Sequence, residues 1–359
     1  MLSARRFALT CLAASVNAYS LGGARSSWRV RSLVTSPTMS EAVADAATKD
    51  DEFADVKPGT VFMFPGQGAQ VVGMGAEAAA EVPAAAELYA KAKDILGYDL
   101  LAIDDKAQLD KTDVSQPAIF VASMAAVEKL KASEPEVVES ANMAMGLSLG
   151  EYTALCFAGA ISFEDGVKIT KARGEAMQAA SEAASSGMVS VIGLDKDKVA
   201  DVCKAAAEAT GKEIGIANYL CNGNYACSGA MEAVEKVVEI AKPDFKARMA
   251  VKLAVAGAFH TDFMAPAVDK LKEVLAEVEV SKPRIPVISN VDAKSHSDPA
   301  VIKDILTKQV TAPVQWETIM TELNAAGYEA GYELGPGKVL SGIMKRVDKK
   351  APAITNIEV

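Results

Sequence analysis

The sequence is poor in histidine, in aromatic side chains and in paired cysteines. Its 359 residues contain two histidines, His260 and His296, and 6% aromatic residues. None of the five cysteines has another at the C-x-x-C spacing of zinc or redox sites, so we expect no metal site, and we expect the four beyond Cys11 to be reduced, packed thiols. Any catalytic imidazole must therefore come from one of two positions.

Acidic residues are absent from the first forty positions, which hold five arginines. The formal net charge of the chain is −10 and that of this segment is +5, so the remainder carries −15. A body this acidic repels nucleic acid and anionic membrane surfaces. We therefore expect neither a nucleic acid nor a membrane among its partners.

Residues 1–40 have the composition of a targeting presequence. Phe7–Val16 is an apolar run too short to span a bilayer, and a Ser- and Arg-rich stretch without acids follows it. This order resembles the two-part presequences of plastids of secondary origin and predicts a plastid stromal protein. A simple mitochondrial or primary-plastid presequence is the alternative. Residues 41–56 carry six acids and one lysine, without an apolar period, and are expected to form a disordered spacer.

The body predicts an α/β fold. The apolar run Val61–Phe64 is expected to be a buried strand, and Met143–Met145 a second strand that runs into a glycine-flanked turn and a helix. We expect a large α/β-hydrolase-like catalytic domain with a parallel sheet core over 57–186 and 254–350, followed by a C-terminal tail, 351–359.

Between the two halves of this domain, residues 187–253 have a different pattern of expected strands and helices. Strands and helices are expected there in the order βαββαβ, which is the ferredoxin-like pattern. This predicts a small inserted subdomain with strands at Met188–Gly193, Ile214–Asn218, Tyr225–Ser228 and Met249–Leu253 and helices at Lys198–Thr210 and Met231–Ala241.

The segment Gly146-Leu147-Ser148-Leu149-Gly150 offers a nucleophile. A serine hydroxyl attacks a carbonyl only if a base takes its proton and donors stabilise the resulting oxyanion. Glycines on both sides permit a tight strand-to-helix turn that exposes Ser148 and aims the Leu149 N–H toward the oxyanion. Without a base, the same segment is only a turn between a strand and a helix.

The base is expected to be His260, which follows the small and apolar run Ala254–Phe259 at the end of a buried segment. A histidine packed in the core is the alternative. His296 lies in the polar, turn-like Lys294–Asp298 and is expected to be a solvated surface residue. No acidic residue stands out as a third member, and a carbonyl oxygen suffices to fix the imidazole tautomer. The sequence therefore predicts a Ser-His dyad.

Taken together, five stretches resemble the motifs of the malonyl-CoA:acyl-carrier-protein transacylase family, in order and from about Val61 to Val347. They are Phe64-Pro65-Gly66-Gln67-Gly68-Ala69-Gln70, Gly146-Leu147-Ser148-Leu149-Gly150-Glu151-Tyr152, Lys171-Ala172-Arg173-Gly174, Gly257-Ala258-Phe259-His260-Thr261, and Gln309-Val310 with Pro313-Val314-Gln315-Trp316.

The resemblance implies a role for each site residue. Ser148 would carry the malonyl group as an ester, with His260 as general base and later acid. Gln67 and the Leu149 N–H would form the oxyanion hole, and the backbone carbonyl of Gln309 would orient the imidazole.

The same resemblance implies how the substrate is bound. Arg173 would bind the free malonyl carboxylate, for which guanidinium is a planar, bidentate match; a solvated helix-face arginine is the alternative. Gln116 and Met177 match pocket-lining positions, and Phe259 beside the base would exclude the extra methyl of methylmalonyl. Many members have a histidine where this chain has Leu147. That histidine is not the base, so we expect activity to survive the difference.

We therefore expect a plastid-type, ping-pong malonyltransferase of fatty-acid biosynthesis, which takes malonyl from coenzyme A and passes it to the phosphopantetheine thiol of acyl carrier protein. It would need no cofactor or metal and would act as a monomer. A serine hydrolase or thioesterase, an acyltransferase for another acyl-CoA, and a non-catalytic scaffold that binds the carrier protein are the alternatives.

Overall fold

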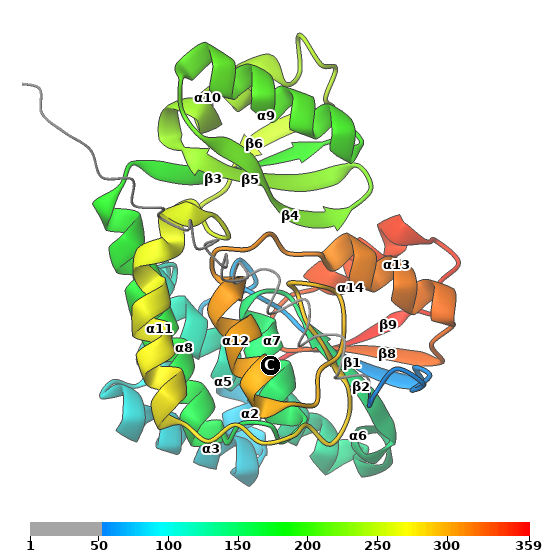
Figure 1. The fold of residues 1–359 in the computed structure, drawn as a ribbon. Helices are drawn as coiled ribbons and strands as arrows, with labels where there is room; N and C mark the ends of the chain where they lie inside the picture. Colours follow the sequence, from blue (N-terminus) through cyan, green and yellow to red (C-terminus); the bar gives the residue numbers. More distant parts are fainter. Residues whose placement is uncertain (1–51) are drawn as a thin grey trace, which may run out of the picture.

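The computed structural model describes residues 52–359, which form a large and a small lobe (Figure 1). The expected presequence, 1–40, and the spacer up to residue 51 lie outside the described residues. The remaining part of the spacer begins with a turn, and Glu52 there forms an ion pair with Lys282.

A parallel five-stranded sheet in the order β7-β2-β1-β8-β9 forms the centre of the large lobe. Each pairing between its neighbouring strands is parallel, as expected for the α/β core. Its strands are β1 (Thr60–Phe64), β2 (Ala141–Gly146), β7 (Val287–Ile288), β8 (Ala330–Leu334) and β9 (Ile354–Ile357).

The central strand β1 is buried on both faces. Val61 and Met63 pack with Trp316 and Leu340 on one side of the sheet, whereas Phe62 and Phe64 pack in a separate cluster with Phe120 and Tyr152 on the other. Successive side chains of a strand point to opposite faces, so an uninterrupted apolar run suits a strand covered on both sides.

The helices of the large lobe follow the sheet strands along the chain and cover both faces (Figure 1). They are α2 (Ala76–Glu81), α3 (Pro83–Leu96), α4 (Lys106–Leu109), α5 (Thr112–Ser133), α6 (Pro135–Ser140), α7 (Leu149–Phe157), α8 (Phe163–Ala183), α11 (Ala265–Glu277), α12 (Pro299–Gln309), α13 (Trp316–Ala326) and α14 (Val339–Val347), with 3-10 turns η1 (Leu100–Ala102) and η2 (Asp262–Met264). None of the helices within 52–359 is long and apolar enough to cross a membrane.

The small lobe has the expected ferredoxin-like chain order βαββαβ. Its antiparallel sheet has the order β4-β5-β3-β6, and two helices pack against the sheet around a core of their own. The elements are β3 (Ser186–Ile192), α9 (Lys196–Thr210), β4 (Ile214–Cys221), β5 (Asn224–Ala230), α10 (Met231–Ile240) and β6 (Met249–Lys252).

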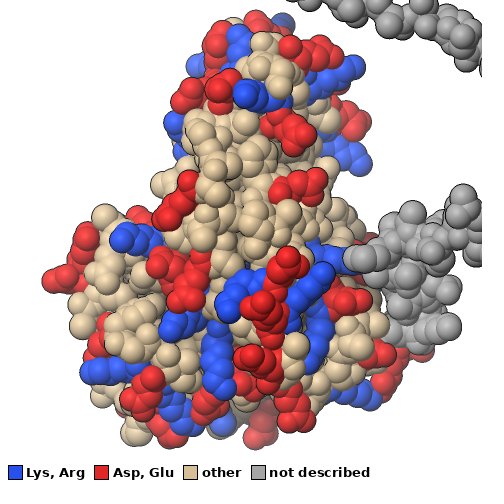
Figure 2. All heavy atoms as spheres, turned by 60° about the vertical axis from the view of Figure 1, so that its left-hand side comes forward, with Lys and Arg blue, Asp and Glu red and all other residues tan. Residues whose placement is uncertain are grey.

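A short parallel bridge ties the small lobe to the large one. The Tyr219 N–H donates to the Val314 carbonyl oxygen at 3.0 Å, and the Val314 N–H donates to the Ala217 carbonyl oxygen at 2.8 Å. On the face in Figure 2, basic and acidic side chains alternate over the large lobe, whereas the waist between the lobes is mostly uncharged. On this face, the lobes meet across a mostly uncharged boundary.

The C-terminal stretch 351–359 differs from the expected tail. Residues Ile354–Ile357 form β9, which pairs in parallel with β8, and the Tyr328 hydroxyl donates to the Pro352 carbonyl oxygen at 2.6 Å. A four-residue strand is too short to show a periodic pattern in the sequence, so its place in the sheet comes from the β8 edge beside it.

Candidate active site

Ser148 lies on the tight turn between β2 and α7. Its backbone has φ 51° and ψ −103°, in the left-handed half of the map that side chains other than glycine rarely adopt. The turn is held against β1, because a Cβ at Gly150 would lie 2.1 Å from the Phe64 carbonyl oxygen and one at Gly146 would lie 2.0 Å from the Gly150 carbonyl. The flanking glycines are therefore required by close backbone contact.

Asn290, just beyond β7, holds this turn from the side. Its Oδ1 accepts the Ser148 N–H at 2.6 Å, and its Nδ2 donates to the Gly146 carbonyl oxygen at 2.8 Å. Two hydrogen bonds to the strained turn offset part of the cost of its unusual backbone conformation. Asn290 was not predicted from the sequence, because these two contacts join residues more than 140 positions apart.

His260 lies beside the serine. Its Nε2 is 2.9 Å from Ser148 Oγ and its Nδ1 is 2.8 Å from the backbone carbonyl oxygen of Gln309. The backbone of His260 also has positive φ, 61°, and its N–H donates to the Val310 carbonyl oxygen. The carbonyl of Gln309 can only accept, so Nδ1 carries the proton and Nε2 faces Oγ as an acceptor.

The imidazole of His260 is buried, and its protonation follows from this. Burial and, to a smaller extent, the positive charge of Arg173 together lower the pKa of His260 to about 4, against the raising effect of the Gln309 carbonyl. The ring is therefore neutral at physiological pH and ready to take a proton from Ser148.

Arg173, on α8, is buried rather than solvated, with 1% of its surface exposed. Its Nη1 donates to Gln116 Oε1 at 2.7 Å, and its Nη2 donates to Gln309 Oε1 at 2.9 Å and to Ser148 Oγ at 3.1 Å. The guanidinium lies over the Tyr152 ring, 5.1 Å from its centroid. Burial lowers the pKa of Arg173, but guanidinium stays charged.

This guanidinium is incompletely paired. Its acceptors within the described part of the chain are neutral, and its Nε has no hydrogen-bond partner there. A buried positive charge without a carboxylate partner is costly. An anionic group brought by a substrate to the nucleophile would supply the missing partner.

Two further predicted residues flank the nucleophile. Leu149 is the first residue of α7, so its N–H has no acceptor within the helix. Gln67, on the loop after β1, donates from Nε2 to Thr112 Oγ1 at 3.3 Å, whereas its buried Oε1 has no partner among the described residues. Both lie where the β1 and β2 loops meet.

A cavity of about 250 Å³ opens at the nucleophile, between the lobes. Met177, which accepts a hydrogen bond from Gln116 Nε2 on its sulfur, and the buried Phe259 lie in its wall. The small lobe and its connections contribute mainly apolar side chains. The predicted residues in the wall are Gln67, Gln116, Ser148, Arg173, Met177, Phe259 and His260, whereas Leu149 and Gln309 lie outside it.

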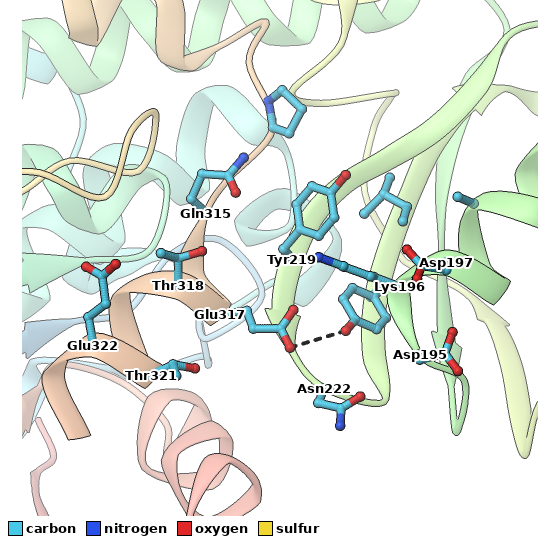
Figure 3. A pocket seen from close by; sticks show the side chains of 14 residues that line it. Asp195, Lys196, Asp197, Tyr219, Asn222, Gln315, Glu317, Thr318, Thr321 and Glu322 are labelled. Atoms are coloured by element: carbon cyan, nitrogen blue, oxygen red, sulfur yellow. Dashed lines mark hydrogen bonds between the residues drawn. The ribbon is translucent and has the colours of Figure 1, made fainter. Parts of the chain in front are cut away.

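A larger cleft of about 870 Å³ lies elsewhere, between α9 and β4 of the small lobe and α13 (Figure 3). Its wall is polar, and the Tyr225 hydroxyl there donates to Glu317 at 3.2 Å. Ser148, His260 and Arg173 do not line it. The smaller cavity, which these three side chains line, is therefore the candidate active site.

His296 corrects the expectation of a solvated histidine. Only 4% of its surface is exposed, and its Nε2 is 3.1 Å from Asp292 Oδ2. The chain just before His296 folds back on itself, because the Ser289 N–H donates to the Lys294 carbonyl oxygen and Ile288 forms an antiparallel bridge with Ser295. A polar sequence therefore does not place the ring in water. His296 is also outside the wall of the nucleophile cavity.

Glu151, one turn after Ser148 on α7, is a buried carboxylate to which the sequence analysis gave no role. Its Oε2 accepts the Gln309 Nε2–H at 2.7 Å and the Asn290 backbone N–H at 3.0 Å. Burial raises the pKa of Glu151 to about 7 against these hydrogen bonds. Its position in the Gly146–Tyr152 motif was the available signal.

The side chains that meet at the nucleophile define the chemistry of the site. Within residues 52–359, no group of three or more His, Cys, Asp or Glu side chains is arranged to hold a metal ion. The residues brought together are a hydroxyl, a neutral imidazole and an incompletely paired guanidinium, which suit acyl transfer of an anionic acyl group.

Comparison with known proteins identifies the family of the chain. Residues 61–358 match the acyl transferase domain family. The human mitochondrial malonyl-CoA-acyl carrier protein transacylase is 42% identical over 306 residues, which cover 81% of this chain and 78% of that protein.

Solved structures are similar over the same region. An acyl carrier protein S-malonyltransferase from Vibrio cholerae is 37% identical, with a TM-score of 0.76 over 82% of this chain and 96% of that one. A malonyl-transacylase solved in complex with its type II polyketide acyl-carrier protein is 34% identical, with a TM-score of 0.76 over 83% of this chain and 94% of that one. The chain belongs to the malonyl-CoA-acyl carrier protein transacylase family.

Proposed function

We propose that this protein transfers malonyl from coenzyme A to the phosphopantetheine thiol of acyl carrier protein, and so supplies malonyl units for fatty-acid biosynthesis. The observation that carries the proposal is the buried, incompletely paired Arg173, whose Nη2 is 3.1 Å from Ser148 Oγ. A positive charge at this distance from the nucleophile selects an acyl group with a carboxylate at its far end.

In the first half-reaction, His260 takes the Ser148 proton while Oγ attacks the thioester carbonyl. The oxyanion is stabilised by Gln67 and the Leu149 N–H. Collapse of this intermediate breaks the carbon–sulfur bond, and the imidazolium returns the proton to the departing coenzyme A thiolate. The malonyl ester of Ser148 remains, with its carboxylate on Arg173.

In the second half-reaction, His260 takes the proton of the incoming phosphopantetheine thiol, and the sulfur attacks the ester carbonyl. The carbon–oxygen bond breaks, and the imidazolium protonates Ser148 Oγ. The free enzyme and the malonyl carrier protein result. Gln116, Met177 and Phe259 line the acyl chamber, and the Gln309 carbonyl keeps the proton on Nδ1 through both steps.

We further propose that no metal or cofactor takes part, that the enzyme acts as a monomer, and that it works in a plastid. The composition of residues 1–40 supports organelle import, and the mitochondrial location in the human relative's name makes the mitochondrion the alternative. Import of the first sixty residues fused to a fluorescent protein tests the compartment, and size-exclusion chromatography with light scattering tests the monomer.

The decisive experiment is mass spectrometry of residues 57–359 after brief exposure to malonyl-CoA. We expect one malonyl adduct, on Ser148, that is lost in Ser148→Ala and is chased onto added holo carrier protein. An adduct at another residue overturns the assignment. A chase to water at the same rate with and without carrier protein identifies a hydrolase instead.

A further inference from the structure

Glu151 sits beneath the catalytic residues without touching the cavity. Its carboxylate is 2% exposed and accepts, on the single oxygen Oε2, hydrogen bonds from the Gln309 side chain and the Asn290 backbone. Both donors also bind the nucleophile turn: Gln309 through the Ser148 carbonyl oxygen and Asn290 through the Ser148 N–H. One buried acceptor is therefore linked to the turn along two branches.

The hydrogen bonds of the Gln309 branch fix the orientation of the Gln309 side-chain amide. Its Nε2 donates both to Glu151 Oε2, at 2.7 Å, and to the Ser148 carbonyl oxygen, at 2.9 Å, so both amide protons face α7. Its Oε1 consequently points the other way, where it accepts the Arg173 Nη2–H at 2.9 Å. An amide turned by 180° would set its N–H groups against the guanidinium donors and its oxygen against the carboxylate.

We propose that Glu151 is a positioning residue that acts through the Gln309 side-chain amide to hold Arg173 in register with Ser148 Oγ for acyl groups that carry a carboxylate. This inference rests on the proposed function and adds a determinant of its acyl preference. Only the backbone carbonyl of Gln309 has a role in orienting His260, so the amide side chain is free to serve Arg173.

The two branches have different kinetic signatures. The Asn290 branch supports the Ser148 turn, on which every acyl group depends. The Gln309 branch ends on Arg173, which only a carboxylate-bearing acyl group requires. Loss of Glu151 should therefore lower malonyl transfer more than acetyl transfer, whereas a general loss of structure lowers both together.

The experiment compares Glu151→Met and Glu151→Gln with the wild-type enzyme, using malonyl-CoA and acetyl-CoA as donors and holo carrier protein as acceptor. Methionine fills the space without an acceptor oxygen, whereas glutamine keeps one oxygen for Gln309 and Asn290. We expect Glu151→Met to lower kcat/KM for malonyl by about tenfold more than for acetyl, and Glu151→Gln to keep the wild-type ratio within about threefold.

Glu333→Gln is the matched control. Glu333 is also a fully buried carboxylate, and it accepts the backbone N–H groups of Leu340 and Ser341 at the start of α14. We expect this variant to lower Tm without changing the malonyl-to-acetyl ratio. Tm is measured for every variant, so that a loss of folded protein is separated from a change in preference.

Gln309→Met tests the same branch if Glu151→Met does not fold, because it keeps the backbone carbonyl that His260 needs. We expect the same selective loss of malonyl transfer and, where both single variants fold, no additional selectivity loss in the double variant. Equal losses for the two acyl groups, or a Glu151→Gln ratio as low as that of Glu151→Met, overturn the inference. A wild-type enzyme that is not labelled by malonyl-CoA overturns the proposed function itself.

Discussion

The Nδ1 of His260 lies 2.8 Å from the backbone carbonyl oxygen of Gln309, so a neutral acceptor stands where α/β-hydrolases place a carboxylate. A carbonyl fixes the imidazole tautomer without adding a negative charge. Because no carboxylate offsets burial, the pKa of His260 falls to about 4. The base therefore stays unprotonated over the whole physiological range.

The pH dependence of acylation follows from this. We expect the rate of Ser148 acylation, measured by rapid quench with malonyl-CoA, to show no loss as pH falls from 8 to 6 on account of His260, and to fall through a pKa near 4. An inflection near pH 6.5 in the plot of acylation rate against pH would show instead that the His260 imidazole is solvated.

The same shift affects folding stability. The unfolded chain binds a proton on this histidine near its ordinary pKa of 6.5, whereas the folded protein binds it only near 4, so the stabilisation is present above 6.5 and is lost as pH falls. The contribution is about 3 kcal/mol. Tm must therefore be measured at each acidic pH at which the acylation rate is measured, so that unfolding is not mistaken for protonation of the base.

Arg173→Ala tests the carboxylate-binding role. We expect kcat/KM for malonyl-CoA to fall by about 30-fold or more, because a buried charge-assisted contact is lost, and acetyl-CoA to be affected less. Arg173→Lys, which keeps the charge without the planar fork, should recover part of the malonyl activity. Parallel losses for both acyl groups would show that Arg173 supports the fold and not the substrate.

Gly150→Ala tests the close contact at the turn. The added Cβ would lie 2.1 Å from the Phe64 carbonyl oxygen, so we expect a loss of about 2 kcal/mol or more in the free energy of unfolding, together with loss of acylation. Gly342→Ala is the matched control, because a Cβ there meets no atom within 4 Å and alanine favours the helix. Urea denaturation measures both, and equal stabilities would refute the contact.

Phe259→Ala tests the size limit of the acyl chamber. The ring is buried beside His260 and lines the cavity. We expect the ratio of methylmalonyl to malonyl transfer to rise about tenfold, since one methyl group is worth roughly 1 to 3 kcal/mol in such a pocket. Competition between the two thioesters measures the ratio directly. An unchanged ratio would locate the methyl limit in another part of the wall.

The local parts of the fold were readable from the sequence. The apolar run of β1 and the glycines around Ser148 report constraints that act within a few residues, and the βαββαβ order of the small lobe could be counted along the chain. The chain has two histidines, and the apolar residues just before His260 were enough to identify it as the expected base.

The remaining parts depend on contacts between distant segments. Asn290 reaches the turn from β7, and Glu151 has a role only because Gln309 and Asn290 converge on it from other elements. His296 was misjudged for the same reason: its neighbours are polar, and its burial depends on how the loop folds back.

The strand β9 has a consequence for how the molecule is made. The first strand along the described residues, β1, is central in the sheet, yet one neighbour begins at Ala141 and the other at Ala330, and β9 closes the edge only with Ile354–Ile357. Parallel pairings over such separations form slowly. A nascent chain that stops short of β8 leaves β1 paired on one side only, so the central sheet is completed only when synthesis is nearly finished.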